Sequence, residues 1–459
     1  MSDKQQYHIW TIGCQMNVAD SQRVAAGLER LGYMPAERAE EADVVVLNTC
    51  VVRQQPEDKA VGRLNQLKRF KERHPDRVLA LMGCLVGVKS PAELEERFPW
   101  VDLYLPPSDP TELWAHLAEH QQLDEAQLLI ADAQARRVAL GRTDTILPPS
   151  EEGRVVSAYL PVVLGCAHAC TYCVIPYRRG AERSRPLGAV AAEARQMAEQ
   201  GVREVTLLGQ IVDRYGYDLD EFAGTQIPPL VTLLERVHAI EGLERIRFLT
   251  SHPNWMKDAL LQAVAALPKV CEHIEVPLQS GDDTVLARMR RGYTADDYRR
   301  LVARIRRLIP GVSIATDVIV GFPGETEAQF ENTYALLEEL ALDKAHIARY
   351  SARPLTVATR SYEDDVPYQE KERRRRELDV LQERILTEKN AHFVGETVEI
   401  LVEGKQARTG RWFGRTRTAR LVFFEAEETW LGRSASVTVT WAGPWSLVGE
   451  IRREENPHD

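Results

Sequence analysis

The sequence lacks any long uninterrupted hydrophobic run. No segment of its 459 residues approaches the roughly 20 apolar residues that a membrane-spanning helix needs. The first ten residues, MSDKQQYHIW, contain no apolar signal region. We therefore expect a cytoplasmic protein with no membrane partner.

The sequence also has few cysteines and no net positive charge. Seven cysteines in 459 residues are too few for a disulfide scaffold, and a reducing compartment would keep their thiols available for metals. The net charge of −10 gives no global argument for nucleic-acid binding. Any RNA-binding site must therefore come from local basic patches. The length of the chain predicts two to four domains.

Three of the cysteines, Cys166, Cys170 and Cys173, lie close together in the segment GCAHACTYCVIPYRRG. The apolar run at residues 158–164 precedes them and predicts a strand buried on both faces, so the cysteines follow a strand's carboxyl end. Structural zinc sites use four ligands, whereas a cubane iron–sulfur cluster can accept three thiolates and leave one iron open. The spacing favours a catalytic cluster; the alternative is three structural cysteines.

Three more cysteines, Cys14, Cys50 and Cys84, each follow a predicted strand within three residues. We place these strands at residues 7–12, 43–47 and 77–82, and the intervening helices at 20–32, at 56–74 and from Ser90 onward. Asp20 is the expected N-cap of the first helix. Strand–helix alternation predicts a doubly wound parallel sheet, whose strand ends meet at one edge. The three cysteines should therefore converge and hold a second cluster.

A second strand–helix series follows a polar segment at residues 133–152, which we interpret as a linker. Besides the strand at 158–164, its predicted strands lie at residues 204–208, 245–249, 272–276, 312–319 and 344–349. Six such units are fewer than the eight of a complete barrel, so we expect a partial (β/α)6 barrel. Cys271, without a cysteine neighbour, should be a small buried hydrophobic residue.

The periodicity changes again near residue 390. Short predicted strands at 397–402, 418–424 and 434–439 indicate a small antiparallel β-barrel. Residues 405–420 contain six basic and no acidic residues, interleaved with Trp412 and Phe413. This mixture is typical of RNA binding and points to Arg411, Arg415, Arg417 and Arg420; the alternative is a basic hairpin with two core aromatics.

These motifs resemble known families over nearly the whole chain. The spacing of Cys166, Cys170 and Cys173, with Tyr172 beside them, resembles the cluster loop of the radical S-adenosylmethionine (SAM) superfamily. The motifs GCQMNVADS, NTCVVR and GC around the N-terminal cysteines resemble the methylthiotransferase family, most closely its MiaB-type members. The stretch GRTRTARLVFF resembles a TRAM domain.

The resemblance implies an α/β protein with a doubly wound N-terminal domain at residues 1–145, a radical SAM core at 150–385 and a TRAM barrel at 390–455. It implies two 4Fe–4S clusters, one on Cys14, Cys50 and Cys84. The segments after the barrel strands resemble a SAM pocket, and the expected SAM contacts are Gly209, Gln210, Gln279, Ser280 and Gly321.

The implied reaction is methylthiolation at C2 of N6-isopentenyladenosine at position 37 of tRNA. It would use two SAM molecules, a sulfur-carrying N-terminal cluster, an external electron donor and a sulfur source, and we expect a monomer that binds the tRNA anticodon stem-loop. Ile211 and Asp213 replace two asparagines of the family pattern. The alternatives are methylthiolation of threonylcarbamoyladenosine or of a ribosomal-protein aspartate, or a non-catalytic iron–sulfur regulator that binds RNA.

Overall fold

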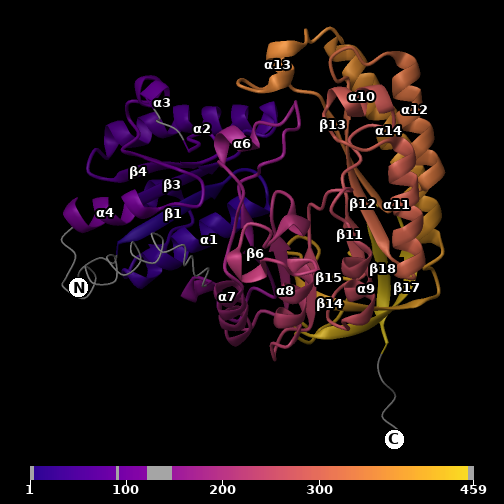
Figure 1. Ribbon diagram of the computed structural model, residues 1–459. Helices are drawn as coiled ribbons and strands as arrows, with labels where there is room; N and C mark the ends of the chain where they lie inside the picture. Colours follow the sequence, from indigo (N-terminus) through magenta and orange to yellow (C-terminus); the bar gives the residue numbers. More distant parts are fainter. Residues whose placement is uncertain (1–4, 89–91, 121–146, 453–459) are drawn as a thin grey trace, which may run out of the picture.

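The N-terminal domain is built on a parallel sheet with the order β2-β1-β3-β4-β5 (Figure 1). The computed structural model describes residues 5–88, 92–120 and 147–452. The sheet strands are β1 (Gln6–Thr11), β2 (Met34–Pro35), β3 (Val44–Thr49), β4 (Val78–Gly83) and β5 (Leu103–Leu105). Strands β3 and β4 are buried along their whole length, as expected for apolar strands covered on both faces.

Helices cover both faces of this sheet. The helices are α1 (Gln15–Arg30), α2 (Gln54–Arg73), α3 (Ala92–Arg97) and α4 (Thr111–His120), with a 3₁₀ turn at Ala39–Glu41. Helices α1 and α4 share one hydrophobic core, and α2 packs in the core on the other face. The predicted doubly wound sheet is confirmed.

The first helix begins earlier than predicted. Asp20 is not an N-cap: α1 starts at Gln15 with Cys14 in the N-cap position, and Asp20 lies buried within the helix. The turn that leaves β1 sets the helix start, and Asp20 instead serves as a buried ion-pair partner. The expected cap at Ser90 and most of the expected linker lie outside the described residues.

The central domain has the six predicted strands. They are β6 (Ser157–Pro161), β9 (Glu204–Leu208), β10 (Arg245–Phe248), β11 (His273–Glu275), β12 (Ser313–Val320) and β13 (Lys344–Arg349). Two parallel groups, β10-β9-β6 and β11-β12-β13, are joined by a bridge between Ile246 and Val270. The predicted run 158–164 is divided: its end forms β7 (Val163–Leu164), which pairs with β8 (Arg183–Ser184).

Helices alternate with the strands of this partial barrel, and most of them lie on its outer side (Figure 1). They are α6 (Ile175–Arg178), α7 (Leu187–Glu199), α8 (Pro229–His238), α9 (Asp258–Ala266), α10 (Asp283–Arg288), α11 (Ala295–Leu308), α12 (Glu327–Leu340), α13 (Val357–Ser361) and α14 (Tyr368–Ala391), with 3₁₀ turns at Pro149–Glu151, Val212–Arg214 and Asp220–Phe222. No helix of the described residues combines the length and apolarity needed to cross a bilayer.

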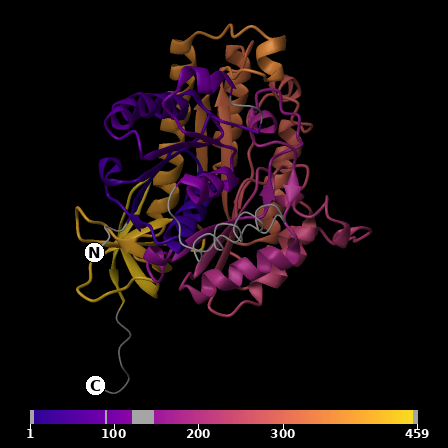
Figure 2. The ribbon, with the colours of Figure 1, turned by 90° about the vertical axis from the view of Figure 1, so that its left-hand side faces the viewer.

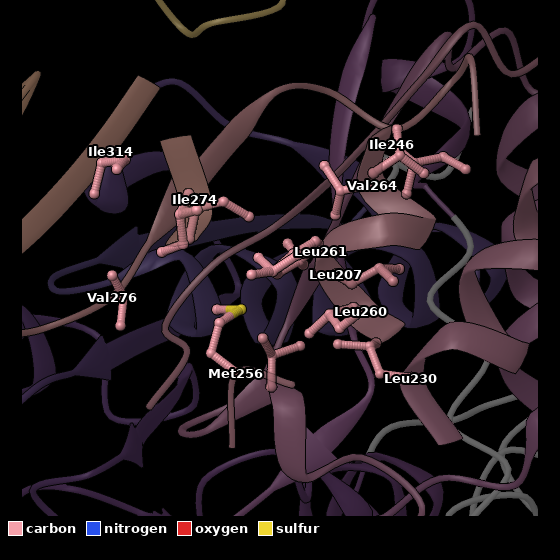
Figure 3. Close-up of a cluster of buried hydrophobic side chains, with 14 of the residues drawn as sticks. Leu207, Leu230, Ile246, Met256, Leu260, Leu261, Val264, Ile274, Val276 and Ile314 are labelled. Carbon is pink, nitrogen blue, oxygen red and sulfur yellow. The ribbon is translucent and has the colours of Figure 1, made fainter. Parts of the chain in front are cut away.

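The core of the barrel is aliphatic. Figure 3 shows Leu207 of β9 and Ile246 of β10 facing Leu261 of α9 and Leu230 of α8. Each of these side chains is fully buried. Cys271 is also buried, in agreement with its predicted role as a small hydrophobic residue. Burial of this apolar surface holds the strand ends in fixed positions and thereby fixes the loops that follow them.

The C-terminal domain is a closed barrel with the order β14-β15-β16-β18-β17. Its strands are β14 (Thr397–Lys405), β15 (Trp412–Arg415), β16 (Leu421–Phe424), β17 (Ser434–Ala442) and β18 (Leu447–Ile451). All pairings are antiparallel except β16 with β18. Figure 2 shows this yellow barrel at the lower end of the molecule, away from α13 at the top.

Candidate functional site

A cavity of about 270 Å³ lies at the carboxyl ends of the central strands. Residues that follow β9, β10 and β11 line it, as do residues of β12 and β13. Cys166, Cys170 and Cys173 line the same cavity. The predicted position of the cysteine loop at a strand end therefore places its thiols at the ligand-binding face of the barrel.

Glycine is required at the base of this cysteine loop. Gly165 has φ +69°, and a Cβ there would lie 2.1 Å from the carbonyl oxygen of Ala181. The loop closes where the Cys166 amide donates to Gly180 at 3.1 Å. On the other side, Thr171 donates its hydroxyl to the Arg288 carbonyl at 2.9 Å. These bonds fix the loop before any cofactor binds.

Two of the three sulfurs already accept hydrogen bonds. The His168 amide donates to Cys166 Sγ at 3.4 Å, and the Arg291 guanidinium donates to Cys170 Sγ at 3.1 Å. Burial raises the pKa of Cys166 to about 11 and that of Cys173 to about 12. Without a metal these two thiols stay protonated at neutral pH, and iron binding must displace their protons.

The cavity also contains buried polar atoms that have no protein partner. They are His168 Nε2, Ser251 Oγ, His252 Nε2 and Gln279 Oε1. Unpaired polar atoms are costly to bury, so this set fits a polar ligand with several donors and acceptors. The Gln279 backbone has φ +74° and is held by β12, donating to Asp317 at 2.8 Å.

The five residues expected to contact SAM divide into two groups. Gln210 and Gln279 line the cavity. Gly209, Ser280 and Gly321 are not among its lining residues: Ser280 is fully buried near the Thr333 hydroxyl, and a Cβ at Gly321 would lie 2.3 Å from Lys371 Cγ.

Sequence reasoning missed several lining residues. Arg291, Asp317 and His346 line the cavity but were not among the expected site residues, whereas His252 lies in one of the strand-end segments that resemble a SAM pocket. Burial and the neighbouring Arg291 lower the pKa of His252 to about 2, and burial also lowers that of His346 to about 4. Both rings are therefore neutral at physiological pH. His346 lies within a strand that has no motif, so no sequence signal could have found it.

The three N-terminal cysteines follow β1, β3 and β4, as predicted. A Cβ at Gly13 would lie 2.4 Å from Cβ of Cys50, so only glycine permits this approach. The hydrogen bond from the Cys50 thiol lowers the pKa of Cys14 to about 6. The Cys84 amide donates to the Thr49 carbonyl at 2.9 Å, which ties the third loop to the second.

A buried polar network explains the motifs around these cysteines. The Asn17 side chain donates to the Ile12 carbonyl at 3.0 Å and to the Thr49 carbonyl at 2.8 Å. Asn48 donates in return to the Asn17 carbonyl at 2.9 Å and to Ser21 at 3.0 Å. The motifs GCQMNVADS and NTC thus supply the side chains that tie the cysteine loops together.

Three cysteine thiolates are suitable ligands for a cubane cluster, and Cys166, Cys170 and Cys173 also meet its geometric requirement. Within the described residues, no three or more His, Cys, Asp or Glu side chains form a site for a metal ion. A cubane places each cysteine on a different iron, so it needs separate thiols around a space rather than ligands that meet at one point. Cys166, Cys170 and Cys173 around the cavity provide that arrangement.

The N-terminal domain reaches the cavity of the central domain. Val52 and Arg53, which follow Cys50, line the same cavity as Cys166, Cys170 and Cys173. A more open groove of about 890 Å³ adjoins it and shares Arg53 with it. Residues of α14 line this groove, and Ala348 and Arg349 of β13 line both the groove and the cavity.

The four arginines expected to bind RNA have protein partners. Arg411 pairs with Glu425 at 2.9 Å and Arg415 with Glu403, both within the C-terminal barrel. Arg417 pairs with Glu272 at 2.8 Å and Arg420 with Asp343 at 2.9 Å, both in the central domain. Trp412 is buried in the barrel core, which agrees with the alternative interpretation of this ring as a core aromatic.

Comparison with known proteins divides the chain into three matches. Residues 6–106 match the Uncharacterized protein family UPF0004, residues 160–337 match the Radical SAM superfamily, and residues 391–451 match the TRAM domain. A solved radical S-adenosylmethionine methyltransferase, TsrM from Kitasatospora setae, superposes with a TM-score of 0.53 and 16% identity. It covers 78% of this chain and 75% of its own, and it supports the fold alone.

Curated relatives match over nearly the full length. The tRNA-2-methylthio-N(6)-dimethylallyladenosine synthase of Roseiflexus sp. (strain RS-1) is 47% identical over 98% of this chain and 90% of its own. The enzyme of the same name from Herpetosiphon aurantiacus is 45% identical over 98% of both chains. The chain therefore belongs to the radical SAM methylthiotransferase family that these synthases represent.

Proposed function

We propose that this enzyme methylthiolates C2 of N6-isopentenyladenosine at position 37 of tRNA, giving 2-methylthio-N6-isopentenyladenosine. The names of the two relatives support this substrate. The observation that carries the proposal is the shared cavity, where Val52 and Arg53 of the Cys50 loop meet Cys166, Cys170 and Cys173. A sulfur-carrying site and a radical-generating site can then act on one base.

In this proposal Cys166, Cys170 and Cys173 hold a 4Fe–4S cluster, and SAM occupies the adjoining cavity. Gln210 and Gln279 line that cavity, and the unpaired Ser251 hydroxyl offers a further hydrogen bond. The bound cofactors supply a 5′-deoxyadenosyl radical, which can remove a hydrogen that no acid–base chemistry activates, such as adenine C2–H.

We further propose that Cys14, Cys50 and Cys84 hold a second 4Fe–4S cluster that carries the sulfur. Two SAM molecules are used, one for the methyl group and one for the radical. An external electron donor and a sulfur source complete the reaction, and the enzyme acts as a monomer.

The target base must leave the anticodon-loop stack to enter the cavity. The groove beside the cavity is the proposed path for the neighbouring nucleotides. Tyr368 is 65% exposed there, and the Arg349 guanidinium lies 4.4 Å from its ring centroid. The guanidinium lies over the ring and also pairs with Glu372 at 3.0 Å. An exposed aromatic ring with a cation against it suits a base and its phosphate.

The test offers the reconstituted enzyme three versions of one anticodon stem-loop: unmodified, isopentenylated and threonylcarbamoylated. The isopentenylated RNA should give methylthio product, because an apolar tail gains roughly 0.8 kcal/mol for each buried methylene. The carboxylate of the threonylcarbamoyl tail should be rejected by an apolar site. Product on the threonylcarbamoylated RNA alone would assign the enzyme to that substrate.

Two further outcomes separate the remaining alternatives. Ribosomal protein is offered to the enzyme in a parallel reaction, and methylthiolation of an aspartate there, with no product on RNA, would identify a protein-modifying enzyme. RNA binding without cleavage of SAM would identify a non-catalytic regulator.

A further inference from the structure

A buried arginine connects the two cysteine sites. Arg179 lies six residues after Cys173, on the segment that leaves the radical loop, yet its side chain enters the N-terminal domain. Its Nε donates to Cys84 Sγ at 3.3 Å. The side chain is only 3% exposed, so this contact is shielded from water.

The other nitrogens of Arg179 are held by the N-terminal network. One Nη donates to Asn17 Oδ1 at 2.9 Å and lies 3.4 Å from the Asp20 carboxylate. Asn17 and Asp20 are themselves fully buried. The other Nη donates to the Ser108 hydroxyl at 3.4 Å. The guanidinium is therefore held at all three nitrogens, and its Nε–H has a set direction toward the sulfur.

The radical site has the same kind of contact. Arg291 donates to Cys170 Sγ at 3.1 Å and is oriented by the Tyr293 hydroxyl at 3.0 Å. Each cysteine set thus has one buried guanidinium directed at one sulfur. Two independent occurrences of the same contact argue against incidental packing.

We propose that Arg179 is a positioning residue for the N-terminal cluster: it donates a hydrogen bond to the Cys84 sulfur and raises the reduction potential of that cluster. This inference rests on the proposed role of Cys14, Cys50 and Cys84 as cluster ligands. Hydrogen bonds to cluster sulfurs and nearby positive charge favour the reduced state. Because Arg179 lies on the segment that leaves the radical loop, it also fixes the orientation of one site relative to the other.

The test compares Arg179→Gln and Arg179→Lys with a matched control, Arg178→Gln. Arg178 also crosses the domain boundary, donating to the Leu85 carbonyl at 3.2 Å, but it contacts no sulfur among the described atoms. All three are placed in full-length protein with Cys166, Cys170 and Cys173 replaced by Ala, so that only the N-terminal cluster remains. Iron content, the electron paramagnetic resonance spectrum and the reduction potential are then measured.

Arg179→Gln should make the reduction potential of the N-terminal cluster more negative. The potential of Arg179→Lys should lie between those of Arg179→Gln and the parent, and the potential of Arg178→Gln should equal that of the parent. In the unreplaced background, methylthio product should fall about 10- to 100-fold in Arg179→Gln, while deoxyadenosine formation persists. If Arg179→Gln loses its iron, a potential in Arg179→Lys more negative than that of the parent supports the role, and a potential equal to the parent's overturns it.

An unchanged potential and spectrum in Arg179→Gln would overturn the role of Arg179 alone, as would an equal shift in Arg178→Gln. Absence of iron from the parent with Cys166, Cys170 and Cys173 replaced would overturn the role of Arg179 together with the proposed second cluster.

Discussion

Asp213 is a buried carboxyl at a position where the family pattern has asparagine. Its two oxygens accept the His252 amide, each at 3.1 Å. Burial raises the pKa of Asp213 from 3.8 to about 7, and the amide hydrogen bond offsets this only in part. Asp213 therefore accepts the hydrogen bond that an asparagine could accept at this position next to the cavity. Unlike asparagine it can ionise, and burial disfavours the ionised form.

This raised pKa predicts a stability that depends on pH. Between about pH 4 and 7 the unfolded chain releases the Asp213 proton while the folded chain keeps it, so stability decreases as pH rises through this range. Asp213→Asn should therefore be more stable than the parent at pH 8, by up to about 4 kcal/mol, and equal to it near pH 4. Denaturant unfolding at both pH values measures this, with exposed Asp220→Asn as the control. An equal difference at the two pH values would contradict the explanation.

The role of the radical-site cysteines can be tested by measuring the iron content per chain. Replacing Cys166, Cys170 and Cys173 with Ala should reduce the iron content after anaerobic reconstitution from about eight to about four per chain, if both sites hold cubanes. SAM cleavage should stop, because no open iron remains to bind SAM. Deoxyadenosine formation at the parental rate would exclude these residues as the radical site.

Single residues show where sequence reasoning ends. The strand-end position of Cys14 was predictable, because hydrophobic runs mark strands and parallel strand ends meet. The role of Asp20 was not, because an acid early in a helical pattern is also a good N-cap. Only the structure shows that its partner, Arg179, lies 159 residues away.

Among the elements, the C-terminal barrel packs against the amino ends of the central strands. Arg245, the first residue of β10, donates to Glu399 at 2.8 Å, and Arg417 pairs with Glu272 beside β11. The cavity lies at the opposite, carboxyl ends of the same strands. The arginines predicted to contact RNA thus include two, Arg417 and Arg420, that bind the central domain.

Because of this geometry, neutralising some of these arginines should lower stability, whereas neutralising Arg411 should weaken tRNA binding. Arg417→Gln with Arg420→Gln should lower the free energy of unfolding by about 2 kcal/mol, because charged hydrogen bonds are lost. Arg411→Gln, on the exposed hairpin, should leave stability unchanged and weaken tRNA binding with a flatter salt dependence. Thermal unfolding and a salt series separate the two effects. A flatter salt dependence at unchanged stability in the Arg417 and Arg420 variant would return those residues to the RNA interface.

The groove between α14 and the start of α2 should carry more of the RNA contact near the target base. Tyr368→Ala should weaken stem-loop binding by about 1–3 kcal/mol if a base stacks on the ring. Val380→Ala, on the same helix and 67% exposed, is the matched control. Equal affinities for the two variants would place the RNA path elsewhere.

The elements themselves were largely predictable. The bounds of β9 and β13 matched the predicted ones, although β13, KAHIAR, alternates polar and apolar residues. Strands β15 and β18 were not predicted. Strand β15 holds Trp412 within a basic stretch that also fits an exposed loop. Its burial depends on ring packing against β14 and β16, which local pattern does not encode.

At the scale of the whole molecule, function depends on how two domains meet. Each cysteine set could be predicted within its own domain. Their common cavity could not, because domain packing depends on surface complementarity rather than on periodicity. Contacts such as Arg178 with Leu85 and Arg353 with Gln54 at 2.7 Å join the domains over long sequence separations.

This arrangement predicts that the two sites can be separated genetically. Replacing Cys14, Cys50 and Cys84 with Ala should abolish methylthio product, because the proposed sulfur carrier is lost. SAM cleavage should continue, because Cys166, Cys170 and Cys173 belong to another domain with its own hydrophobic core. Deoxyadenosine and methylthio nucleoside are measured in the same anaerobic reaction, with iron content near four per chain as the check on folding.

Methylthio product from this variant would mean that the N-terminal cysteines are structural and that the sulfur enters by another route. Loss of both products with the iron retained would mean that the N-terminal cluster is needed for the radical step itself, which would contradict the proposed division of labour between the two domains.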